Sequence, residues 1–145
     1  MKKTLFLIAI TVVPLIAGSI IYLAFRPTAI VSKAIYGLFD INPAYIETPD
    51  NLFWRFIKYY LGDFLWAFSL TALVKLILGK GKPQSIVALS IGISVGFLVE
   101  LFQKYGLIPG TFDFFDLLVE TLGAILSLII TIIHSRRNEN EKQTD

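Results

Sequence analysis

Six polar side chains that can bind a ligand or exchange a proton interrupt the apolar stretches of this sequence. Carboxyl or carboxamide groups occur in this set at Asp63, Glu100, Gln103, Asp113, Asp116 and Glu120. A carboxylate in a low-dielectric environment must take up a proton, pair with a cation or bind a metal ion. Because each outcome is a form of ligand chemistry, these residues are the first candidates for a binding site.

Neighbouring residues define the chemistry that the set can perform. Arg55 is included in the candidate site as a cationic partner of Asp63, and Arg26 and Lys58 are further partners. Oxygen ligands suit Mg²⁺ or Ca²⁺, although the sequence requires neither ion and the cofactor is unknown. Paired carboxyl groups also serve acid–base catalysis. The chain has no cysteine, and its one histidine, His134, lies at the opposite end of the last apolar stretch, so no catalytic residue is assigned.

Four long apolar segments must position these groups. They cover about residues 4–25, 59–78, 84–104 and 114–134 of a chain that is 55% apolar. Each segment reaches the roughly 20 residues that a transmembrane helix needs. The first segment exceeds the apolar part of a signal peptide, roughly 7–15 residues, and has no good cleavage site, so we expect it to be retained. The predicted fold class is an all-α, polytopic bundle of four transmembrane helices.

Lysines near the segment ends predict the orientation of the bundle. The short turn that carries Lys80 and Lys82 has no acidic residue, and the positive-inside rule then places both termini in the cytoplasm. Residues 1–135 would form a single membrane domain with an extracytoplasmic loop at 26–58. The charged residues 136–145 would form a disordered cytoplasmic tail. The net charge of +2 argues against a nucleic-acid partner.

In this orientation, three segments carry their carboxyl groups at one depth, near the outer surface. A charged residue at the bilayer centre costs about 2.5–3.5 kcal/mol, so such groups normally face the bundle interior. A Gly92-x-x-x-Gly96 pattern leads to Glu100 on one helix face, and small residues allow close packing. Similar small-residue faces lead to Asp63 and Asp116. We therefore predict a tight three-helix core with an outward acidic pocket; the alternative is that these groups only join helices or lie at the interface.

Two linked motifs resemble those of the VanZ-like family. A Glu100-x-x-Gln103 pair near the end of the third segment is followed by a short loop and then by Phe112-Asp113-Phe-Phe-Asp116-Leu, which leads into the last segment. The resemblance covers about half of the chain, residues 62–126. It implies a bacterial multi-pass protein of the cytoplasmic membrane, and Glu100, Gln103, Asp113 and Asp116 match the family pattern.

Two features depart from that pattern. Members often carry Asn where this sequence has Glu120, and the start of the second segment, Gly62-Asp63-Phe-Leu-Trp66-Ala67, instead resembles a related uncharacterised group. The family takes its name from a protein that confers low-level teicoplanin resistance. The departures count against carrying the resistance function itself over to this chain.

Three functions remain open at this point. The leading hypothesis is a non-enzymatic binding protein for a cell-envelope ligand, a lipid or a wall precursor, linked to glycopeptide antibiotic tolerance. The second is a membrane enzyme that acts on an envelope lipid or glycan through paired carboxylates, Glu100 and Asp116. The third is a small ion- or proton-coupled transporter. The lipid bilayer is the expected partner in each case, and a homodimer is left open.

Overall fold

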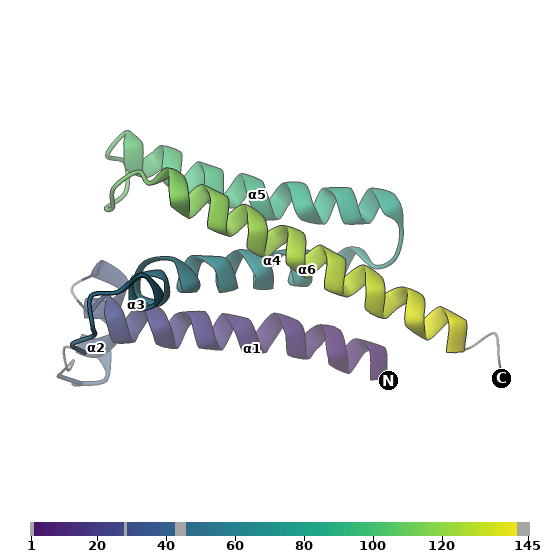
Figure 1. Cartoon of the computed structure of the whole chain (residues 1–145), viewed down its shortest axis with the longest axis horizontal. Helices are drawn as coiled ribbons and strands as arrows, with labels where there is room; N and C mark the ends of the chain where they lie inside the picture. Colours follow the sequence, from purple (N-terminus) through teal and green to yellow (C-terminus); the bar gives the residue numbers. More distant parts are fainter. Residues whose placement is uncertain (1, 28, 43–45, 142–145) are drawn as a thin grey trace.

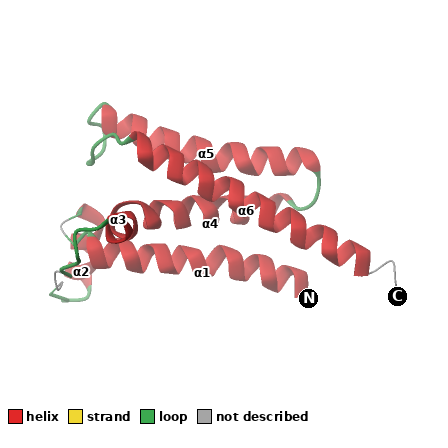
Figure 2. Ribbon diagram, in the orientation of Figure 1, coloured by secondary structure: helices red, strands yellow, loops and turns green. Residues whose placement is uncertain are grey.

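The computed structural model describes residues 2–27, 29–42 and 46–141. Most of these residues are helical (Figures 1 and 2). In chain order the elements are α1 (Lys2–Phe25), α2 (Ile30–Leu38), α3 (Leu52–Phe56), a π-helical turn (Ile57–Leu61), α4 (Gly62–Leu78), α5 (Lys82–Lys104) and α6 (Phe114–Glu141). A longer connection joins α2 to α3.

Four stretches of the described residues are helical, long and apolar enough to cross a membrane. They cover Leu5–Phe25, Leu52–Leu78, Lys82–Lys104 and Phe114–Arg136. The predicted all-α fold class is thus confirmed, and we treat the chain as a multi-pass membrane protein. Large apolar side chains point outward along these helices, for example Ile20 at 60% exposure. Such exposure is expected where lipid, rather than water, surrounds a bundle.

The helices pack around α4, which contacts both α1 and α6 extensively. Helix α5 packs against α6 and α4 on the other side of the bundle, so α1 and α5 lie far apart in Figure 1. Within the described residues, α1 makes no substantial packing contact with α5. The arrangement therefore leaves one side of α4 without a covering helix, between α1 and α5.

Small residues sit at the contacts where the helices approach most closely. Gly92 of α5 lies against the Thr71 side chain of α4, and Gly123 of α6 lies against the backbone carbonyl of Phe64. Gly18 of α1 leaves room for the ring of Trp66. The predicted close contact of the second, third and fourth apolar segments is therefore present, and α1 joins it through its own glycine.

The predicted site residues lie at one end of the bundle, and the start of α1 and the end of α6 lie at the other. Helix α1 begins and α6 ends beside the α4–α5 turn, whereas α2, α3 and the α5–α6 loop lie at the opposite end (Figure 1). The rings of Phe6 and His134 stack 3.8 Å apart and join α1 to α6 near the chain ends. The arrangement matches a topology with both termini on one side, and the assignment of that side to the cytoplasm stays a prediction.

Two helix boundaries differ from the expected ones. The second membrane helix begins at Leu52 rather than at residue 59, because the Asn51 side chain accepts a hydrogen bond from the Trp54 N–H at 3.0 Å and caps a new first turn. Helix α6 continues to Glu141, into the segment expected to be disordered, and its Arg and Glu residues are good helix formers. Residues 142–145 of the expected tail lie outside the described residues.

Candidate functional site

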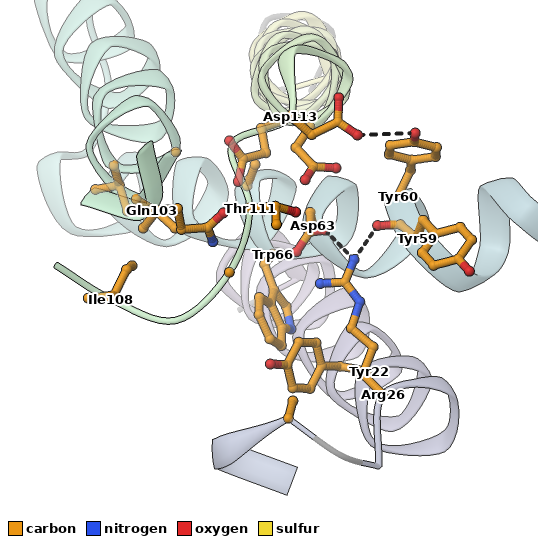
Figure 3. Close-up of a pocket in the computed structure, with 18 of the residues that line it drawn as sticks. Tyr22, Arg26, Tyr59, Tyr60, Asp63, Trp66, Gln103, Ile108, Thr111 and Asp113 are labelled. Carbon is orange, nitrogen blue, oxygen red and sulfur yellow. Dashed lines mark hydrogen bonds and ion pairs between the residues drawn. The ribbon is translucent and has the colours of Figure 1, made fainter. Parts of the chain in front are cut away.

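A pocket of about 1030 Å³ lies at the end of the bundle that carries α2 and α3. Residues of α1, α4, α5, α6 and the α5–α6 loop line it, and Figure 3 shows how they converge. The predicted site residues that line the pocket are Asp63, Gln103, Asp113, Asp116 and Glu120. The fold thus gathers most of the predicted site residues, which are far apart in sequence, on one cavity.

The charged pair Arg26–Asp63 joins α1 to α4 across the pocket. Arg26 Nη2 lies 3.2 Å from Asp63 Oδ2, and it also donates a hydrogen bond to the backbone carbonyl of Tyr59 (Figure 3). The guanidinium carbon lies 5.4 Å from the centre of the Tyr22 ring. Both side chains are mostly buried, at 32% and 16% exposure. The only basic side chain among the described pocket-lining residues is therefore already paired with a carboxylate.

Glu100 lies behind the pocket and fixes the junction between α5 and α6. Its side chain is buried, and its Oε2 accepts a hydrogen bond from the backbone N–H of Asp113 at 2.8 Å. Asp113 in turn precedes the first residue of α6, and its Oδ1 accepts a hydrogen bond from the Phe115 N–H at 2.8 Å, as an N-cap does. Glu100 is thus a positioning residue for this junction.

Asp113 also connects the junction to α4. The hydroxyl of Tyr60 donates a hydrogen bond to Asp113 Oδ2 at 3.3 Å (Figure 3). Tyr60 belongs to the π-helical turn before α4, and such turns frequently occur at functional sites. Asp113 therefore has hydrogen-bond partners at both carboxyl oxygens.

Asp116 and Glu120 are the pocket acids with unsatisfied atoms. They lie one turn apart on α6, which places them on the same face, and both line the pocket. Asp116 Oδ1 and Glu120 Oε2 are buried and have no hydrogen-bond partner among the described residues. The Glu120 carboxyl group rests where a side chain on Gly96 would otherwise lie. Buried polar atoms normally have partners, so these two oxygens stand out among the carboxyl groups of the site.

Gln103 supports the loop that closes the pocket. Its side-chain amide lies directly against Gly110, which has a φ of 139°. A residue with a Cβ is strained at this φ and would also collide with Gln103. The pair therefore keeps the loop close to the end of α5.

Arg55 lies outside the pocket. Its guanidinium group forms a two-pronged interaction with Asp50, at 2.7 and 3.3 Å, and both side chains are exposed. Because α3 begins at Leu52, Arg55 lies within a short helix beside its own loop partner. The cation that reaches Asp63 is Arg26, which the sequence placed among the partners but not among the site residues.

Aromatic residues that were not among the predicted site residues form a part of the pocket wall. Tyr22, Tyr59, Tyr60 and Trp66 all line the cavity. The rings of Tyr22 and Trp66 lie 5.0 Å apart, and the buried Trp66 Nε1 has no hydrogen-bond partner among the described residues. Clustered aromatic residues near the helix ends were the one sequence feature that could have indicated this wall. An aromatic belt at the membrane interface produces the same pattern.

No three His, Asp or Glu side chains in residues 2–27, 29–42 and 46–141 are grouped in a way that could hold a metal ion. We therefore assign no ligand set for Mg²⁺ or Ca²⁺.

Comparisons of this sequence and structure with models of protein families, with curated proteins and with solved structures find no match.

Proposed function

We propose that this protein binds a cell-envelope ligand, a lipid or a wall precursor, in the pocket at the end of its membrane bundle. The observation that carries the proposal is the convergence of Asp63, Asp113, Asp116 and Glu120, from two helices and a loop, on one cavity of about 1030 Å³. Small-molecule sites usually occupy about 300–1,000 Å³. The cavity is therefore large enough for an organic ligand.

The cost of polar groups in a membrane supports a binding function. Carboxyl groups within membrane helices are expensive and are normally retained for function. Of the pocket acids, Asp63 and Asp113 are satisfied by other groups of the chain, whereas Asp116 and Glu120 keep buried oxygens without partners. Because Asp116 and Glu120 line the cavity, a bound ligand with hydrogen-bond donors would find carboxyl acceptors there.

The proposed setting is the bacterial cytoplasmic membrane, with both termini inside and the pocket facing outward. The acid-free turn with Lys80 and Lys82 supports this orientation. The resemblance to the VanZ-like family supports the bacterial cytoplasmic membrane as the setting. Three residues that carry this resemblance, Glu100, Asp113 and Asp116, lie together at the α5–α6 junction and the pocket. A role in tolerance to glycopeptide antibiotics is part of this proposal.

A membrane enzyme is the second candidate, and one observation favours it. Asp116 and Glu120 lie one turn apart on α6 and both line the cavity, which places two carboxyl groups where acid–base chemistry would need them. Glu100 is engaged with the Asp113 N–H, so the carboxylate pair of an enzyme would be Asp116 and Glu120. Turnover of envelope lipids or glycans by the purified protein, lost in Asp116→Asn, would favour this candidate.

Retention of a lipid through purification tests the binding proposal. The full chain would be extracted from bacterial membranes in a mild detergent, and the bound species would be measured by native mass spectrometry. We expect a species of defined mass on the unchanged protein and its loss in Val95→Phe, because Val95 lines the cavity and is partly exposed. Glu47→Gln, an exposed acid outside the pocket, is the control. A protein that retains no lipid, or retains the same species in Val95→Phe, would contradict the proposal.

A further inference from the structure

The pocket has an apolar part below its polar part. Leu15 of α1 and Leu70 of α4 line the pocket below Arg26 and Asp63, and Val95 and Val99 of α5 add apolar side chains to its wall. On α1 the lining runs from Arg26 down to Leu15, a distance of about 16 Å at the rise of an α-helix. The cavity therefore has the shape and polarity gradient of an amphiphile, with a polar head position at one end and an apolar chain position along the helices.

The apolar part is accessible from the side of the bundle. Its walls belong to α1 and α5, which make no substantial packing contact within the described residues, and its floor belongs to α4. Leu15 and Val95 line the cavity while 47% and 43% of their surfaces remain exposed. A lipid chain can therefore reach the pocket laterally from the bilayer, between α1 and α5.

Carboxyl groups outnumber basic groups in the polar part of the pocket. Four carboxyl groups line it, from Asp63, Asp113, Asp116 and Glu120, against the single guanidinium group of Arg26. That guanidinium group is paired with Asp63. The carboxyl groups of Asp116 and Glu120 also line the cavity, where a cation with N–H donors would gain charge-assisted hydrogen bonds.

The aromatic wall adds a second attraction for a cation. Tyr22 and Trp66 face the cavity with their rings 5.0 Å apart, and Tyr60 approaches from the opposite side (Figure 3). An organic cation is attracted to the faces of such rings, most strongly to Trp, when it lies within about 6 Å of the ring centre. Carboxyl groups and aromatic rings on one cavity are a combination that recognises amines.

From these observations we infer that the ligand is a cationic amphiphile. Its amine head lies between Asp116, Glu120 and the aromatic wall, and its apolar chain lies along Leu15, Leu70 and Val95. The inference rests on the proposed binding function and specifies the chemical class of its ligand. An anionic head group would meet an excess of carboxyl groups, and a bare metal ion would leave most of the 1030 Å³ unfilled.

Quenching of Trp66 fluorescence by brominated amphiphiles tests the inference. The chain has two tryptophans, so Trp54→Phe leaves Trp66, in the pocket wall, as the single reporter. The full-length Trp54→Phe protein would be placed in phosphatidylcholine nanodiscs. Two probes would be added separately, octadecylamine and octadecylsulfonate with the same dibrominated chain, so that only the head group differs.

We expect half-maximal quenching at a mole fraction of the amine about tenfold lower than that of the sulfonate, which corresponds to the difference of one charge-assisted contact. In the same background, Asp116→Asn with Glu120→Gln should remove this difference, because the amide groups carry no charge. Glu47→Gln changes an exposed acid outside the pocket and should keep the difference.

The outcomes separate the ligand class from the binding function itself. If both probes quench equally and Val95→Phe abolishes this quenching, the preference for an amine head group is overturned, but a lipid-binding pocket is retained. Equal quenching that Val95→Phe does not change would contradict both proposals. A preference for the amine that persists in the Asp116→Asn, Glu120→Gln protein would overturn the assignment of the head position to those acids. The comparison of the two head groups is made in the Trp54→Phe protein, whose pocket is unchanged. Its result is therefore valid even if the double variant does not fold.

Discussion

The buried carboxylate of Glu100, near the end of α5, accepts a hydrogen bond from the backbone N–H of Asp113, directly before α6, at 2.8 Å. This contact closes the α5–α6 loop and sets where α6 begins. Asp116, one turn further on, then faces the pocket. Of the two carboxylates that the sequence pairs for acid–base chemistry, Glu100 thus holds the backbone and Asp116 faces the cavity.

Replacement of Glu100 tests its positioning role. Glu100→Ala leaves the Asp113 N–H without its partner and should lower the free energy of unfolding by about 1–3 kcal/mol. Glu100→Gln keeps an acceptor oxygen and should cost less. Denaturant titration of the purified protein in detergent would measure both, with the exposed Glu47→Gln as the control. Equal losses in the two Glu100 variants would show that charge, and not the acceptor, matters at this position.

The Arg26–Asp63 pair should be energetically coupled. Each single change, Arg26→Gln or Asp63→Asn, leaves a partly buried charge without its partner, whereas the double variant leaves none. We expect a coupling energy of about 0.5–3 kcal/mol in a double-mutant cycle of unfolding free energies. Additive losses would mean that the 3.2 Å contact does not stabilise the α1–α4 arrangement. Arg55→Gln, whose partner Asp50 is fully outside the bundle, should cost almost nothing.

The packing of α4 against α6 requires a glycine at position 123. A Cβ there would collide with the backbone carbonyl of Phe64, and the backbone cannot move away as a flexible side chain can. Gly123→Ala should therefore lower the free energy of unfolding by about 1–3 kcal/mol. Gly37→Ala is the matched control, because the space beside Gly37 of α2 is open and alanine favours a helix. A neutral Gly123→Ala protein would contradict this helix contact.

The orientation of the bundle can be read with single cysteines. The chain has none, so Lys82→Cys at the start of α5 and Leu107→Cys in the α5–α6 loop each provide one thiol. With both termini in the cytoplasm, a membrane-impermeant maleimide should label Leu107→Cys in intact cells and Lys82→Cys only after lysis. The reverse pattern would place the pocket on the cytoplasmic side. Leu107 is 69% exposed, so its thiol is accessible to the reagent.

Local patterns in the sequence are sufficient to predict the membrane helices and their packing faces. Hydropathy and length depend only on consecutive residues. The four apolar segments therefore predict the four helices that are long and apolar enough to cross a membrane within the described residues. Small residues one turn apart lie on one face whatever the partner, so the close approach at Gly92 and Gly123 follows from the same reasoning. The shared depth of the acids also follows, because depth depends on position along each helix.

The tertiary structure decides which residues meet. Arg55 and Arg26 were both plausible partners of Asp63 in the sequence, and the structure pairs Asp63 with Arg26 because the end of α1 lies beside the π-helical turn and α4. Arg55 instead pairs with Asp50, because an Asn51 cap begins α3 before the expected helix start. The pocket itself depends on α1 and α5 standing apart over α4. Rotation and spacing of helices arise from contacts between distant segments, and no pattern within a single segment encodes them.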